Sequence, residues 1–314
     1  GTQIQDRALP NIPIEGVPQV VFKEVSGQYM DGTIYKLRMP KYNVKDLQFG
    51  SLGWEIQFSG RVAQPLFGVG FLEAIPIEAI KALEDPEDRN TDGISGRLAR
   101  VVDRHMKVKV GRFGWKASQP DLFAQTALAL HQDMGLTSAE HMEQNCTRRQ
   151  LACNVAAKQT GPEVNAAQLD QLVAYQRALA PLKTGPSNDL GRILFVETGC
   201  AACHRPSWEL PDTVWPPMLS NITIYPYTDM LLHDMGPGLA DGLAEGAASA
   251  SEWRTAPLWG ISARMPYRLL HDGRARSIEE AILWHDGEGR IARENFRALE
   301  KHERDALAAF VAGL

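Results

Sequence analysis

The chain has 314 residues, of which 44% are hydrophobic and 23% are charged, and its formal net charge is −5. This length allows one to three domains with a sizeable core. The acidic balance argues against a nucleic-acid-binding protein, which usually carries a basic face, and the lack of any run of eighteen apolar residues argues against a membrane span. No signal peptide is recognisable, and the start at Gly1 suggests a processed or truncated product.

The first 75 residues mix short alternating segments with glycine and proline. "VVFKEV" (20–25), "TIYKLRM" (33–39) and "WEIQF" (54–58) show the period-two pattern that predicts strands. Helices are predicted after them, around "PIEAIKALED" (76–85), "QPDLFAQTALALHQDMG" (119–135) and "NAAQLDQLVAYQRALA" (165–180).

The stretch "PLKTGPSND" (181–189) is a plausible linker, because glycine and proline lie close together in it. We therefore place a domain boundary between residues 1–185 and 186–314. Asp189 is expected to cap the next helix, and residues 205–270 are expected to form a long loop. The last helix is predicted from an apolar stripe that must pack against the protein. Its residues are Leu307, Phe310, Val311 and Leu314.

"GCAACHRP" (199–206) contains two thiols and an imidazole within five residues, Cys200, Cys203 and His204. Half of a zinc site, a redox-active dithiol and a covalent attachment site for c-type haem are all possible. A structural zinc site would need a second close pair of ligands, and a thioredoxin-like dithiol would need a preceding strand. Covalent haem needs two thiols for its vinyl groups and an adjacent histidine for its iron, so we favour haem.

The other two cysteines lie in "CTRRQLAC", at Cys146 and Cys153. We favour a local disulfide between them in an oxidising compartment, and the alternative is two partly buried thiols.

His204 would be the proximal iron ligand, and the sixth coordination position needs a second donor. The candidates are His233, His271, His285, Met218, Met235 and Met265. Ser277 and Glu280 show the capping-box pattern, and from this start Ile278, Ala281, Ile282 and His285 share one apolar helix face. A histidine there could be an ordinary core residue. If the chain binds haem, His285 is our first choice for the sixth iron ligand, followed by Met265 and Met235.

"DRNTDG", with Asp88, Asn90, Asp92 and Gly93, has the opening of a calcium loop, but Ala99 stands where the loop needs its last acidic ligand. An Asx-rich surface turn is the favoured interpretation, and calcium is possible.

Several long strings resemble the bacterial di-haem cytochrome c peroxidases and the related di-haem enzyme that matures a tryptophylquinone cofactor. They resemble most a sub-family named as di-haem thiol oxidoreductases or peroxidases. The strings are "DGISGR", "GRFGWKA", "YTDMLLHDMGPGLADG", "EWRTAPLWG", "LHDGRA" and the longer stretch 254–289.

The resemblance implies a mainly α fold of cytochrome c-like domains with long loops and a small β-containing N-terminal region. Residues 1–185 would be the remnant of the first such domain, and residues 186–314 would carry the covalent haem. The distal ligand is a methionine in the peroxidases and a tyrosine in the maturation enzyme; the matching position here is His285.

The resemblance also implies roles for residues of "GRFGWKASQPDLFAQTALALHQDMG". Trp115 aligns with a tryptophan between the two haems, a possible electron relay, and Gln125 aligns with a glutamine ten residues on. Asp133 falls near the distal-pocket acid, two residues out of register, and could instead be a solvated carboxylate at a helix end.

The family's first haem-binding pentad lies upstream of the segment that matches Gly1, so we expect the N-terminal part to be missing. We therefore expect an exported, for example periplasmic, c-type haem oxidoreductase. Its bis-histidine haem would pass electrons to a peroxidatic second haem in the complete protein. The alternative is a non-enzymatic electron-transfer or assembly subunit with one haem. The expected partner is a small cytochrome or cupredoxin, and an oligomer is possible.

Overall fold

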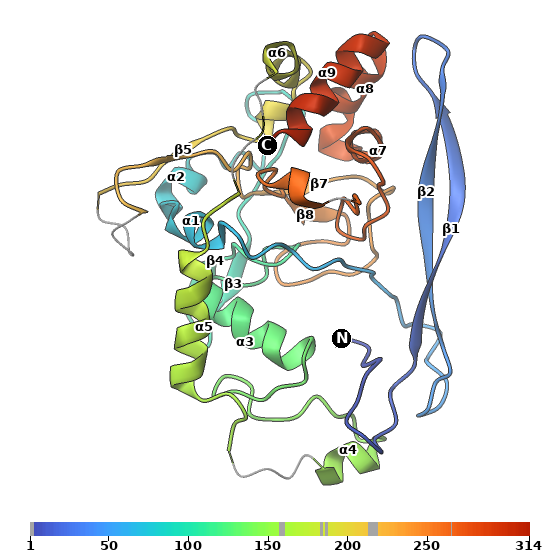
Figure 1. The fold of residues 1–314 in the computed structure, drawn as a ribbon, viewed down its shortest axis with the longest axis vertical. Helices are drawn as coiled ribbons and strands as arrows, with labels where there is room; N and C mark the ends of the chain where they lie inside the picture. The colour runs from blue at the N-terminus through green and yellow to red at the C-terminus, as the bar shows by residue number, and fades with distance from the viewer. Residues whose placement is uncertain (1–2, 157–160, 183–184, 186–187, 213–218, 265) are drawn as a thin grey trace.

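The computed structural model describes residues 3–156, 161–182, 185, 188–212, 219–264 and 266–314. Helices account for 30% of the structure and strands for 17%, and the strands form small antiparallel sheets (Figure 1). The prediction of a mainly α fold is therefore wrong, because strand pairing takes up more of the chain than the resemblance implied. These elements give no firm fold class.

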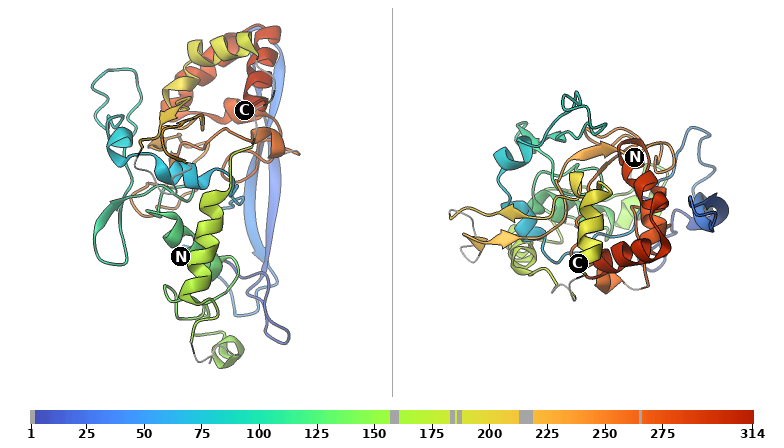
Figure 2. Two further views of the ribbon diagram at one scale, coloured as in Figure 1. Left: turned by 60° about the vertical axis from the view of Figure 1, so that its left-hand side comes forward. Right: turned by 90° about the horizontal axis from the view of Figure 1, so that it is seen from above.

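A long hairpin of β1 (Val17–Gln28) and β2 (Ile34–Lys45) runs along one side of the molecule (Figures 1 and 2). The strands pair without interruption from Val17 opposite Lys45 to Gln28 opposite Ile34. Asp31 closes the turn by accepting a hydrogen bond from the Thr33 amide at 2.8 Å. The alternating segments at 20–25 and 33–39 are thus confirmed as strands.

The tip of this hairpin and the part near its open end are held by residues from the C-terminal part of the chain. Arg304 forms an ion pair with Asp31 at 2.8 Å, and the Tyr42 hydroxyl donates to Asp272 at 3.1 Å. These contacts join segments more than 200 residues apart.

One hydrophobic core lies around the helices of the middle of the chain. They are α1 (Val69–Ala74), α2 (Ile77–Lys81), α3 (Leu122–Gln132) and α5 (Ala166–Ala178). The small sheets beside them are β3 (Arg100–Val102) with β4 (Val108–Val110) and β5 (Trp208–Glu209) with β6 (Thr223–Ile224). Trp208 and Ile224 belong to the same core as Leu122 and Leu169, so residues from both sides of the predicted linker pack together.

A second core lies among the C-terminal helices α6 (Asp189–Glu197), α7 (Ile278–Trp284), α8 (Arg290–Ala298) and α9 (Lys301–Ala312). The predicted stripe on the last helix is confirmed, because all four of its residues are buried in this core. Helix α9 packs closely on α6, where a Cβ at Gly191 would lie 2.2 Å from the Ala306 carbonyl oxygen.

The remaining elements are short. They are α4 (Leu151–Ala156), the sheet of β7 (Leu232–Asp234) with β8 (Glu252–Arg254), and the 3₁₀ turns η1 (Cys200–Ala202), η3 (Ile261–Arg264) and η4 (Gly287–Gly289). Among the helices of the described residues, none has both the length and the apolar character that crossing a bilayer requires.

Candidate functional site

The cysteine pair sits on a tight turn directly after helix α6. The helix begins at Asn188, whose side chain accepts from the Gly191 amide at 2.9 Å, so the cap lies one residue before the predicted Asp189. Gly199, with φ +94°, ends the helix in the left-handed conformation that favours glycine. The following turn brings the His204 amide onto the Cys200 carbonyl oxygen at 2.9 Å.

This turn forms one wall of a cavity of about 370 Å³. Cys200, Cys203 and His204 line the cavity from one side, and His285 at the end of α7 lines it from another. Most of the remaining wall is apolar, for example Phe195, Leu239, Leu269, Ile278 and Val311. An apolar cavity of this size with a few convergent polar groups is typical of a small-molecule or cofactor site.

The imidazole rings of His204 and His285 lie 6.4 Å apart between their centres, with an interplanar angle of 53°. The Nδ1 of His204 lies 3.0 Å from the Tyr227 carbonyl oxygen, and the Nδ1 of His285 lies 2.7 Å from the Ala281 carbonyl oxygen. A carbonyl oxygen only accepts, so Nδ1 carries the proton in both rings. Each Nε2 then keeps the lone pair that a metal ion needs.

Burial lowers the pKa of His204 to about 4, with a smaller contribution from His285, and burial also lowers the pKa of His285. Both rings are therefore neutral at pH 7, as metal ligation requires. Two imidazoles bound through nitrogen to one metal ion at about 2.0 Å would have ring centres up to about 6.3 Å apart. The observed separation matches this value.

The two thiols complete the donor set. Cys200 and Cys203 are free and partly buried, and burial raises the pKa of both thiols. Two neutral thiols at the edge of an apolar cavity, with two neutral imidazoles facing each other across it, fit a covalently bound haem.

Of the other proposed iron ligands, His271 lines the cavity and stacks on Trp253. Met235 also lines the cavity, whereas Met218 and Met265 lie outside the described residues. His233 lines the cavity too, but both of its ring nitrogens are engaged by carboxylates. Its Nδ1 lies 2.6 Å from Glu288 Oε2 and its Nε2 lies 2.8 Å from Asp229 Oδ2. With both nitrogens donating, this ring has no lone pair for a metal ion.

His233 is therefore a buried imidazolium between two acids. Burial opposes its charge, but the hydrogen bonds to Asp229 and Glu288 raise its pKa well above the ordinary value. Glu288 follows His285 by three residues and also accepts from the Ser95 and Asp234 amides, at 3.0 and 2.9 Å. We call the bonded trio of Asp229, His233 and Glu288 the clamp. It joins the segment after His285 to the segment beside Cys203. A metal ion could also be held by Cys203, Asp229 and His233, whose donor atoms lie close together. Both ring nitrogens of His233, however, are already bonded to the carboxylates of Asp229 and Glu288.

A model of the family described as "Di-haem oxidoreductase, putative peroxidase" matches residues 20–314. The chain belongs to this family.

No curated protein matches the chain. A solved structure of hydrazine synthase from Kuenenia stuttgartiensis, pressurised with 20 bar xenon, has 18% sequence identity and a TM-score of 0.35. The match covers 53% of this chain and 61% of that chain.

The resemblance to the di-haem enzymes predicted functional roles for Trp115, Gln125 and Asp133. Trp115 is buried and lines the cavity, and its Nε1 donates to the Val62 carbonyl oxygen at 2.9 Å. Gln125 lies on α3 with its Oε1 buried and without a partner in the described part of the chain. Asp133 is exposed at the C-terminal end of α3. Only Trp115 of these three lines the cavity.

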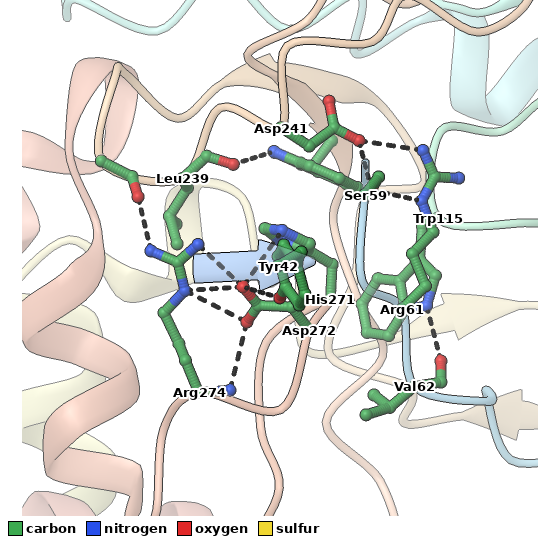
Figure 3. Close-up of polar contacts among 12 residues, drawn as sticks. Tyr42, Ser59, Arg61, Val62, Trp115, Leu239, Asp241, His271, Asp272 and Arg274 are labelled. Carbon is green, nitrogen blue, oxygen red and sulfur yellow. Dashed lines mark hydrogen bonds and ion pairs between the residues drawn. The ribbon is translucent and has the colours of Figure 1, made fainter. Parts of the chain in front are cut away.

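A polar cluster near Trp115 was not predicted as a group, although His271 was a candidate iron ligand (Figure 3). His271 stacks on Trp253 with ring centres 3.7 Å apart, and Asp272 binds Arg274 at 2.8 Å. Nearby, the fully buried Lys116 pairs with Asp241 at 3.1 Å. His271 and Lys116 lie in the strings "LHDGRA" and "GRFGWKA" that carried the resemblance, which was the available signal for this cluster.

Two further predictions concern regions away from the cavity. Cys146 and Cys153 form the predicted disulfide. In the loop at 88–93, Asp88 and Asp92 accept hydrogen bonds from the amides of Gly93 and Ile94, as in an Asx-rich turn. Calcium binding there stays a prediction.

Proposed function

We propose that this chain carries a c-type haem attached through thioethers to Cys200 and Cys203, with His204 and His285 as the axial ligands of its iron. The observation that carries the proposal is the pair of facing, neutral imidazoles, whose ring centres are 6.4 Å apart across the cavity that the two thiols line. When bound, haem supplies a one-electron couple of its iron.

The protein's own residues would set the behaviour of that couple. The Tyr227 and Ala281 carbonyls hold both imidazoles in the tautomer that offers Nε2, so both histidines would be able to hold the iron of a bound haem. A fully ligated iron is suited to electron transfer and not to binding peroxide. A haem iron with two histidine ligands also has a lower reduction potential than one with a histidine and a methionine, because the methionine raises the potential.

We therefore assign the chain an oxidoreductase role in which it relays electrons. In the complete protein the acceptor would be a second haem, with Trp115 on the route, since its ring lines the same cavity. The alternative is an electron-transfer or assembly subunit with a single haem, and the intact mass of the native protein distinguishes the two.

We further propose that the protein is exported from the cytoplasm. The Cys146–Cys153 disulfide supports this location, because disulfides persist mainly in oxidising compartments. A small cytochrome or a cupredoxin is the proposed redox partner there.

Intact-mass measurement and the absorption spectrum of the pyridine-treated native protein test the proposal together. Covalent porphyrin mass with a c-type spectrum supports it, and a Cys200→Ala, Cys203→Ala double variant should lose that mass. Two porphyrins on the native protein favour the enzyme, and one favours the single-haem subunit. Colourless native protein without added porphyrin mass contradicts the proposal.

A further inference from the structure

Arg254, the last residue of β8, is a buried cation in the wall of the cavity. It is 4% exposed and lines the cavity together with His204 and Trp115. No carboxylate of the described residues lies within ion-pair distance of its guanidinium. By contrast, the cavity-lining Arg293 pairs with Asp286 and with Glu294.

The partners that Arg254 does have are neutral. Its Nε donates to the Gly114 carbonyl oxygen at 3.3 Å, and its Nη1 donates to the Thr255 carbonyl oxygen at 3.0 Å. Nη1 also lies 3.8 Å from the Met230 sulfur, and Nη2 has no hydrogen-bond partner in the described part of the chain. Burial lowers the pKa of Arg254 to about 10, so the side chain is charged at pH 7.

The acidic residue that most favours this charge is Asp229, and its oxygens are already used. One oxygen lies 2.8 Å from His233 Nε2, and the other accepts from the Leu231 amide at 2.9 Å. A buried charge without a close counter-ion is costly to a folded protein. An anion bound in the cavity beside the guanidinium would offset this cost.

We propose that Arg254 binds a carboxylate in this cavity, and that this carboxylate is a propionate of the haem. The second half of this inference rests on the proposed function. A planar guanidinium with an unused Nη2 is suited to a carboxylate, and such charge-assisted bonds are stronger than neutral ones. The backbone amide of Arg254 donates to the Trp115 carbonyl oxygen at 2.9 Å, which fixes this wall next to Trp115.

The test is the midpoint potential of the haem in the native protein and in Arg254→Gln. Removing a positive charge beside the haem favours the ferric state, so we expect the potential to fall. A tenfold change in the ferric-to-ferrous ratio corresponds to about 59 mV for one electron. Arg112→Gln is the matched control. Arg112 is 6% exposed and also donates to two backbone carbonyls, but it does not line the cavity, so its variant should keep the native potential.

An Arg254→Gln protein with full haem content and an unchanged potential would overturn the inference. If that variant does not assemble, Arg254→Lys is examined by infrared difference spectroscopy, where altered propionate bands support the inference and unaltered ones oppose it. A native potential that shifts with added acetate would assign the site to a free anion instead. Absence of haem from the native protein would defeat the proposed function, whereas haem without an Arg254 effect defeats only this inference.

Discussion

His204 and His285 face each other across the cavity although 80 residues separate them in the chain, and both rings are fixed by a hydrogen bond from Nδ1 to a backbone carbonyl. One comes from the turn after α6, and the other ends α7. Their agreement in tautomer and in spacing is what a single metal ion between them needs.

Replacing His285 with alanine should open the sixth coordination position of the proposed haem. We expect the absorption and electron paramagnetic resonance spectra to change from low-spin to high-spin, and added imidazole to restore the low-spin form. His302→Ala, at an exposed histidine on α9, should leave the spectra unchanged. A six-coordinate low-spin spectrum in His285→Ala would show that another residue is the ligand.

Replacing His233 with glutamine should destabilise the protein, because Asp229 and Glu288 would lose the buried cation between them. Breaking a buried charge pair by removing one partner costs about 3 to 5 kcal/mol. The free energy of unfolding, measured by denaturant titration, checks this. The exposed change His302→Gln should have little effect, and equal stability of His233→Gln and the native protein would argue against the clamp.

Lys116 offers a second test of a buried charge. It is fully buried, pairs with Asp241 at 3.1 Å and donates to the Leu243 and Ser249 carbonyls at 2.9 and 2.7 Å. Lys116→Met should lower the free energy of unfolding by about 3 kcal/mol, since Asp241 keeps Arg61 as a partner but loses its buried one. The exposed change Lys107→Met is the control, and a loss no larger than in that variant would contradict the expectation.

Stability should depend on pH through His271. Burial lowers its pKa from 6.5 to about 4, so the unfolded chain binds a proton before the folded one does. Stability is therefore lost as the pH falls from 6.5 toward 4, by at most about 3 kcal/mol from this residue. His271→Phe keeps an aromatic ring against Trp253 but does not titrate. Denaturant midpoints between pH 4 and pH 7 should fall less steeply in this variant, and identical slopes would contradict the assignment.

Local signals in the sequence predicted helix α7 and its N-terminal cap. The Ser277 side chain caps α7 by accepting from the Glu280 amide, as predicted, and the helix delivers His285 to the cavity. The Glu280 carboxylate, however, accepts from the Arg276 amide and not from Ser277, so the capping box is incomplete. Alternation alone was not sufficient at 54–58, where no strand forms. A strand needs a partner, and Trp54 is 93% exposed.

The clamp and the buried cations could not be predicted in this way. His233 meets Asp229 four residues away, a spacing visible in "DMLLH", but Glu288 approaches from 55 residues further on. Arg254 lies in the string "EWRTAPLWG", which contributed to the resemblance but indicated no role for this residue. Such residues acquire their partners only through tertiary contacts, for which a single sequence has no periodic signal.

The hairpin at the start of the chain has a consequence for biosynthesis. β1 and β2 are synthesised long before α9, and Tyr42 and Asp31 gain their partners Asp272 and Arg304 only after more than 200 further residues have been made. Contacts of such high sequence separation form slowly, and an early-made strand pair with exposed Val20, Val21 and Phe22 is open to misassociation meanwhile. We expect the nascent protein to require chaperone protection until helix α9 has been made.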